Sequence, residues 1–117
     1  MYKILLVDDE QSIQFAYRQE FEEEGYEVHS ALTGKDALRK LETVSPDLVI
    51  LDITMPGMNG IEVLHKIKEV NPKTKVILSS AHQEYKQDLS AWASDDFIVK
   101  SADMDDLKAA VRRHLSE

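Results

Sequence analysis

Acidic residues follow two apolar runs of the sequence and could carry chemistry there. Residues 48–51 are all apolar and end in Asp52, and residues 3–7 end in Asp8 and Asp9. A short apolar run bounded by turn residues is typical of a strand that is covered on both faces of a parallel sheet. We therefore expect these carboxylates at the carboxyl ends of two strands, which is the edge where open α/β sheets bind ligands.

Carboxylates gathered at one edge repel each other. Two ionised groups about 4–5 Å apart repel by roughly 3–4 kcal/mol at an effective dielectric constant of about 20. A hard divalent cation removes this conflict, and Mg²⁺ favours a few carboxylates together with water and a phosphate. We expect Asp9 and Asp52 to ligate Mg²⁺, and Asp8 to act through water or from just outside the ligand set.

Two further side chains, Ser80 and Lys100, also lie at the ends of apolar runs. A carboxylate can act as a nucleophile that forms an acyl phosphate, provided that a metal and an ammonium group neutralise the phosphoryl oxygens. Asp52 would attack, Lys100 would pair with one phosphoryl oxygen, and the Ser80 hydroxyl would donate to another. Each residue alone could be a turn cap, a salt bridge or a turn hydroxyl, but together they favour a phosphoryl-transfer site.

Strand-like and helix-like segments alternate five times along the chain, and this order would position the side chains. The strand-like segments are residues 3–7, 26–31, 48–51, 76–78 and 97–99. With short connections, the alternation predicts a parallel sheet with helices on both faces and right-handed crossovers. The segment at 26–31 is more polar than the others, which favours a place at the sheet edge.

The helix-like segments carry apolar residues at helical spacing, which predicts the sides that pack on the sheet. The predicted inward residues of the first, third and last helices are Ile13, Ala16, Tyr17 and Phe21; Ile61, Leu64, Ile67 and Val70; and Leu107, Ala110, Val111 and Leu115. Ser12 or a neighbour can start the first helix, and Gly25 can end it. Thr33 and Asp36 resemble a capping box at the start of the second. Residues 84–92 have the weakest helical pattern.

The composition fits one compact domain over residues 1–117, without cysteine and with a net charge of −8. A chain of this length can bury its own core. The negative charge argues against binding of nucleic acid by this domain. We find no charged and apolar leader and no apolar run of membrane-spanning length, so we expect a cytoplasmic protein that does not enter a membrane.

The blocks around these residues resemble the receiver domains of two-component response regulators, over essentially the whole chain. They read LLVDDE at 5–10, DLVILDITMPGMNG at 47–60, VILSSA at 76–81 and DFIVK at 96–100. The resemblance implies a flavodoxin-like (βα)5 fold whose five parallel strands lie in the order 2-1-3-4-5. It also implies that Asp52 is the phosphoacceptor, and that Mg²⁺ is bound by Asp9, Asp52 and the carbonyl of Thr54.

The same resemblance implies a signalling role. A sensor histidine kinase or a histidine phosphotransfer protein would supply the phosphoryl group, and an output domain or an effector protein would receive the signal. Ser80 and Phe97 would form the switch, the hydroxyl moving toward the phosphoryl group while the ring turns inward. Such a domain catalyses only its own phosphorylation and dephosphorylation, so we do not expect an enzyme that acts on other substrates.

Two other classes of protein share part of this pattern. A phosphatase of the haloacid-dehalogenase type also forms an aspartyl-phosphate, but it carries a second Asp two residues after the nucleophile, where this chain has Thr54. A degenerate receiver that only binds other proteins would lack some of the acidic and switch residues, all of which are present here.

The chain also departs from the family pattern. Ser101 follows Lys100 where the family usually has proline, and Ala93-Ser94 replaces the usual Gly-Ala before the fifth strand. His82 follows Ser80 by two residues and could orient the water that hydrolyses the acyl phosphate. The remaining histidines are expected as ordinary exposed or partly packed side chains: His29, His65 and His114.

Overall fold

One parallel sheet forms the centre of the computed structural model, which describes residues 1–53, 60–80, 94–99 and 104–115. Its strands are β1 (Lys3–Val7), β2 (Glu27–Ala31), β3 (Leu48–Asp52), β4 (Lys75–Ser80) and β5 (Asp96–Val99). They lie in the order β2-β1-β3-β4-β5, and every neighbouring pair is parallel. This order confirms the predicted flavodoxin-like arrangement, with the more polar strand β2 at one edge.

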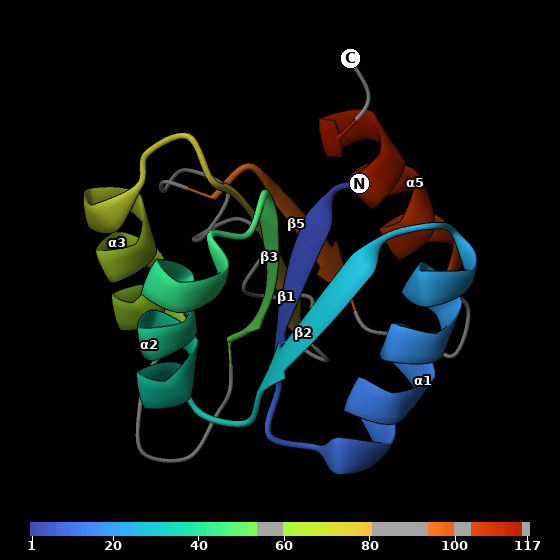
Figure 1. Ribbon diagram of the computed structural model, residues 1–117, viewed down its shortest axis with the longest axis horizontal. Coiled ribbons are helices and arrows are strands. Elements are labelled where there is room, and N and C mark those ends of the chain that lie inside the picture. Colours follow the sequence, from blue (N-terminus) through green and yellow to red (C-terminus); the bar gives the residue numbers. More distant parts are fainter. Residues whose placement is uncertain (54–59, 81–93, 100–103, 116–117) are drawn as a thin grey trace.

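Helices cover both faces of the sheet, as the alternating order predicted (Figure 1). They are α1 (Gln11–Glu23), α2 (Gly34–Val44), α3 (Gly60–Val70) and α5 (Asp105–Leu115). Helices α1 and α5 lie on one face, and α2 and α3 lie on the other (Figure 1). The predicted helix at residues 84–92 lies outside the described residues. Within the described part of the chain, no helix is long and apolar enough to span a membrane.

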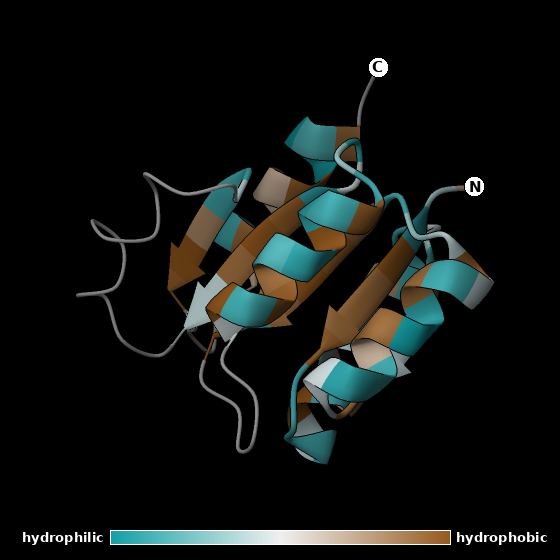
Figure 2. Cartoon of the chain, turned by 90° about the vertical axis from the view of Figure 1, so that its left-hand side faces the viewer, coloured by the Kyte–Doolittle hydropathy of each residue, from teal (hydrophilic) through white to brown (hydrophobic). Residues whose placement is uncertain are grey.

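The strands divide their side chains between two hydrophobic cores. Leu5, Val7, Val49 and Leu51 pack on the side of α2 and α3. The alternate residues of β1 and β3 pack on the side of α1 and α5, namely Ile4, Leu6, Leu48 and Ile50. Figure 2 shows the apolar strands enclosed by helices whose outer faces are hydrophilic. Because side chains alternate along a strand, Asp8 and Asp52 continue the set that faces α1 and α5.

The inward face of α1 differs from the prediction at two positions. Ala16 is exposed, whereas Gln14 is 7% exposed and buried together with Phe21. Gln14, Tyr17 and Phe21 follow helical spacing, so a polar side chain occupies a position that the pattern reserves for an apolar one. The helix begins at Gln11 after Glu10, next to Ser12, which agrees with the predicted start.

The last turn of α3 also differs from the prediction. Val70 is 59% exposed, and the buried residues of this helix are Gly60, Val63, Leu64 and Ile67. Val70 is the last helical residue, and the chain turns away from it through Asn71 and Pro72 to reach β4. The predicted helical spacing is therefore correct as far as Ile67, but the buried face of α3 ends one turn before the predicted Val70.

The predicted helix ends are largely confirmed. Gly25 follows α1 with a positive φ of 95°, which glycine tolerates best. At the start of α2, the backbone N–H of Asp36 donates to Thr33 Oγ1 over 3.0 Å. The carboxylate of Asp36 pairs with Arg39 and Lys40 rather than completing the box. Burial alone would raise the pKa of Asp36, but hydrogen bonds from these two cations lower it.

Candidate functional site

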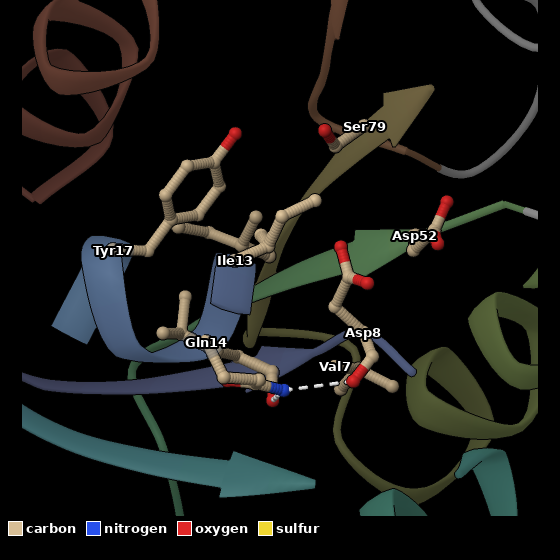
Figure 3. Close-up of a pocket in the computed structure, with 9 residues that line it drawn as sticks. Val7, Asp8, Ile13, Gln14, Tyr17, Asp52 and Ser79 are labelled. Atoms are coloured by element: carbon tan, nitrogen blue, oxygen red, sulfur yellow. Dashed lines mark hydrogen bonds between the residues drawn. The ribbon is translucent and has the colours of Figure 1, made fainter. Parts of the chain in front are cut away.

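The strand register brings two predicted site residues, Asp8 and Asp52, and one further polar residue, Ser79, to one edge of the sheet. Val7 lies opposite Leu51, and Asp52 lies opposite Ser79 on the other side of β3. Asp8 directly follows Val7, so it emerges beside Asp52. Figure 3 shows the side chains of Asp8, Asp52 and Ser79 at the ends of β1, β3 and β4.

The carboxylates at this edge form a compact group. One oxygen each of Asp8, Asp9 and Asp52 lies within 4.8 Å of the others. Asp8 and Asp52 are only 6% and 5% exposed, whereas Asp9 is exposed to solvent. Three hard carboxylate oxygens at this spacing fit a small divalent cation that keeps several of its waters, as Mg²⁺ does. Without a cation, the two buried carboxylates lie where repulsion is screened least.

The hydroxyls of Ser79 and Ser80 belong to opposite faces of β4. Ser79 lines a small cavity together with Asp8 and Asp52, on the side of α1. Ser80 is fully buried and lies opposite Val99 of β5. Its side chain points toward the face that also holds Phe97, which is buried among the residues that pack against α2 and α3. This is the side on which a paired movement of Ser80 and Phe97 would occur.

Several predicted site residues lie outside the described part of the chain. In the sequence, Thr54 follows Ile53, Lys100 follows the last residue of β5, and His82 lies two residues after the end of β4. The strands that precede these three residues, β3, β4 and β5, are described. Val99 pairs with Ser80, so the described part of β5 ends at the same edge as the acids.

Sequence reasoning missed two polar residues that line the cavity with the acids, Gln14 and Ser79. The spacing of Gln14 continues the inward stripe of Tyr17 and Phe21 along α1, but spacing alone does not overcome the hydropathy that argues against a buried glutamine. Ser79 could have been found only from the register, because either of two adjacent serines can end β4. Ala16 rather than Gln14 is predicted on the inward face of α1, because glutamine side chains are mostly exposed in proteins.

The family model of the response regulator receiver domain matches residues 4–112. The chain belongs to this family. Sporulation initiation phosphotransferase F of Bacillus subtilis is 35% identical over 115 residues, which cover 97% of this chain and 93% of that protein. Regulatory protein AtoC of Escherichia coli is also 35% identical over 115 residues, but this match covers 25% of its length. The receiver domain thus spans a quarter of one curated relative and nearly all of another.

Solved structures agree with the fold. The response regulator protein TrrA from Thermotoga maritima, in complex with Mg²⁺-BeF, has a TM-score of 0.93 and 45% identity, with 98% of this chain and 100% of that chain covered. The same protein in complex with the histidine kinase ThkA has a TM-score of 0.91 and 45% identity, with coverage of 99% and 100%.

Glycine at position 60 allows the receiver domain to pack α3 directly against the chain that leaves Asp52. A Cβ on Gly60 would lie 2.7 Å from the Cα of Ile53 and 2.9 Å from the backbone oxygens of Asp52 and Ile53. The Gly60 N–H also donates to the Ile53 oxygen over 3.1 Å. The neighbours are backbone atoms and cannot rotate away, so a side chain here would displace the end of β3.

We expect Gly60→Ala to lower the free energy of unfolding by about 2 kcal/mol and to weaken Mg²⁺ binding, because overpacking shifts the backbone that carries Asp52. Urea denaturation and titration with Mg²⁺ measure the two effects. Gly25→Ala is the matched control at the opposite edge of the sheet, where no atom lies within 4 Å of the added Cβ. It should cost stability through its positive φ but leave Mg²⁺ affinity unchanged. Unchanged affinity in both variants would mean that Gly60 does not position Asp52.

The start of β5, next to Phe97, is anchored to α5. The Asp96 carboxylate accepts from Arg113 and from His114 Nε2, the latter over 3.1 Å. Burial alone would raise the pKa of Asp96, but hydrogen bonds from His114, the Phe97 N–H and Arg113 lower it.

The three histidines outside the acidic site have ordinary surroundings. His114 pairs with Asp96, and His29 Nε2 lies 2.7 Å from the Glu27 carboxylate. The side chain of His65 is exposed. These placements agree with the ordinary roles expected for the three histidines.

Proposed function

We propose that this receiver domain accepts a phosphoryl group on Asp52 from a partner histidine kinase, and that phosphorylation switches its conformation. The observation that carries the proposal is the group of Asp8, Asp9 and Asp52 oxygens within 4.8 Å at the carboxyl edge of the sheet. Asp52 is the member that ends the central strand β3, between β1 and β4. The Asp52 carboxylate is almost fully shielded from water, and it can attack a phosphorus atom while the neighbouring acids hold a cation.

The roles follow from position and residue type. Asp52 is the nucleophile, and Asp8 and Asp9 hold Mg²⁺ with it. The metal would neutralise charge on the transferred phosphoryl oxygens. Thr54, by its backbone carbonyl, and Lys100, by its ammonium group, are assigned from the family pattern, as both lie outside the described residues. Ser80 would donate to the phosphoryl group, and Phe97 would fill the space behind it.

The partner and the output rest on similarity. TrrA, which is 45% identical, has been crystallised with a histidine kinase and with Mg²⁺-BeF, which supports a kinase and magnesium here. A histidine phosphotransfer protein is the alternative donor. Because curated relatives include both short and much longer proteins, the receiver of the signal is either an attached output domain or a separate effector. The cytoplasmic location remains a prediction from the sequence.

We further propose that the chain catalyses only its own phosphorylation and dephosphorylation. Position 54 is a threonine, so the second Asp of a haloacid-dehalogenase phosphatase is missing. Incubation with a small phosphodonor and Mg²⁺, followed by mass mapping of the modified residue, tests the central proposal. We expect a single modification on Asp52 that requires Mg²⁺. Modification of another residue, or none at all, would contradict it.

Ser80→Ala is expected to separate phosphorylation from signalling. The nucleophile and the other acids remain, so the variant should still bind a phosphoryl mimic such as beryllofluoride with Mg²⁺. The buried hydroxyl that would draw β4 toward the phosphoryl group is gone, so the change in conformation should be largely absent. The fluorescence of Trp92, the only tryptophan of the chain, provides the measurement. An identical fluorescence change in wild type and variant would show that the hydroxyl takes no part.

A further inference from the structure

The side-chain amide of Gln14 is bonded to the backbone at the end of β1. Its Nε2 lies 3.1 Å from the Leu6 oxygen, 3.0 Å from the Asp8 oxygen and 2.9 Å from the Ala31 oxygen. The dashed line in Figure 3 marks the contact with Asp8. The two N–H groups of this amide are shared among three carbonyl oxygens, which would repel an amide oxygen, so the carbonyls also fix the orientation of the amide.

These contacts hold the point where the chain leaves the sheet. The Asp8 N–H donates to the Ala31 oxygen over 3.1 Å, and this is the last bond between β1 and the end of β2. Asp8 Oδ1 then accepts from the Glu10 N–H over 3.0 Å, within the turn that leads into α1. Gln14 lies one turn into this helix and reaches back to both strands. It therefore ties together the segments that direct Asp8 and Asp9 toward Asp52.

The burial of Gln14 is not explained by packing of the hydrophobic core alone. Its Oε1 is buried and has no hydrogen-bond partner among the described residues. Leaving such an acceptor unsatisfied costs about 1–3 kcal/mol. An apolar side chain of similar length would fill the position on α1 without that cost. What only the amide provides is a donor to the backbone of Asp8.

We propose that Gln14 is a positioning residue of the acidic site: its amide holds the end of β1 so that Asp8 and Asp9 converge on Asp52. The inference rests on the proposed function for its effect on Mg²⁺, but the restraint on the backbone exists without metal. The hydrogen bonds of its Nε2 go to backbone oxygens and not to the carboxylates that would hold the metal. It acts through the carbonyl of Asp8.

Gln14→Met tests the proposal, because methionine keeps the length of the side chain and removes the amide. We expect Mg²⁺ affinity, measured by titration calorimetry, to fall at least about tenfold, as is common when a group that supports a metal ligand is lost. Gln19→Met is the matched control, since Gln19 is an exposed glutamine on the same helix. Phe21→Leu, a buried change further along α1, controls for lost stability alone. Neither control should alter Mg²⁺ affinity.

Amide hydrogen exchange in EDTA provides a second measurement that needs no metal. In Gln14→Met the Asp8 and Glu10 amides should exchange at least tenfold faster than in the wild type, and in Phe21→Leu they should change only as much as the global stability does. Unchanged exchange at these amides would overturn the proposal. Equal losses of Mg²⁺ affinity in Gln14→Met and Phe21→Leu would do the same, since Gln14 would then act through stability. If the wild type itself binds no Mg²⁺, the proposed function fails, while the exchange result still decides the role of Gln14.

Discussion

Asp52→Asn is expected to abolish Mg²⁺-dependent phosphorylation by a small phosphodonor, whereas Asp47→Asn should leave it intact. Asp47 directly precedes β3 and Asp52 is its last residue, so the two acids lie at opposite ends of the strand. Asp47 is exposed and accepts from the Lys3 N–H over 2.8 Å, and Asp52 is almost fully buried beside Asp8. Asp47 lies five residues before Asp52, which at about 3.3 Å per residue separates them by roughly 16 Å, so only Asp52 can share a cation with Asp8 and Asp9.

The two substitutions are chemically matched. Each replaces one carboxylate by an amide of the same shape, and the new amide oxygen at position 47 can still accept from Lys3. Phosphorylation is followed by intact-protein mass spectrometry over time, with EDTA as the metal-free reference. Asp52→Asn should show no acid-labile, Mg²⁺-dependent modification. Labelling of that variant at the native rate would exclude Asp52 as the phosphoacceptor, and a comparable loss in Asp47→Asn would point to a general defect of folding.

The strand order and the convergence of the acids could be predicted because both depend on pattern. Apolar runs of four residues marked β1 and β3, and the acid after each run had to lie at the carboxyl edge once the strands were parallel. The burial of α5 followed in the same way, since Leu107, Ala110, Val111 and Leu115 are all buried. These features follow from hydrophobic period and chain direction, which a single sequence contains.

What could not be predicted depends on contacts between distant segments. Gln14 is buried because three carbonyl oxygens from β1 and β2 surround its amide, and hydropathy carries no sign of such partners. The need for glycine at position 60 depends on how closely α3 approaches Ile53, a distance that the loop composition does not reveal. Ser79 and Ser80 were distinguishable only once the register with β3 and β5 was known.

Asp52→Asn is also expected to raise the melting temperature of the domain in EDTA, and Asp9→Asn should raise it less. Without a cation, the Asp52 carboxylate is buried next to that of Asp8, so removing its charge relieves repulsion and desolvation together. We expect a gain of about 1–3 kcal/mol in the free energy of unfolding for Asp52→Asn, less than the Coulomb term alone because nearby dipoles and cations relieve part of it. Asp9 is exposed, and water screens its charge.

Millimolar Mg²⁺ should reverse the order of the melting temperatures of the wild type and the two variants. A ligand that binds only the folded state stabilises it by about 2.7 kcal/mol at a hundred times its dissociation constant. Wild type should gain the most, because it offers the full set of carboxylates, and each variant should gain less. Glu42→Gln, which removes an exposed charge from α2, is the control for net charge and should respond to Mg²⁺ as the wild type does.

The sign of the change in EDTA decides between two accounts of the acidic group. If Asp8, Asp9 and Asp52 are crowded for the sake of a cation, the metal-free protein contains a conflict that either substitution relieves, and both variants melt higher than the wild type. If the carboxylates are instead satisfied by hydrogen bonds and cations of the protein itself, removing one of them breaks those bonds and both variants melt lower. If both variants melt lower, the three carboxylates are held close together by hydrogen bonds and cations of the protein itself. The argument for a metal site at this edge would then be lost.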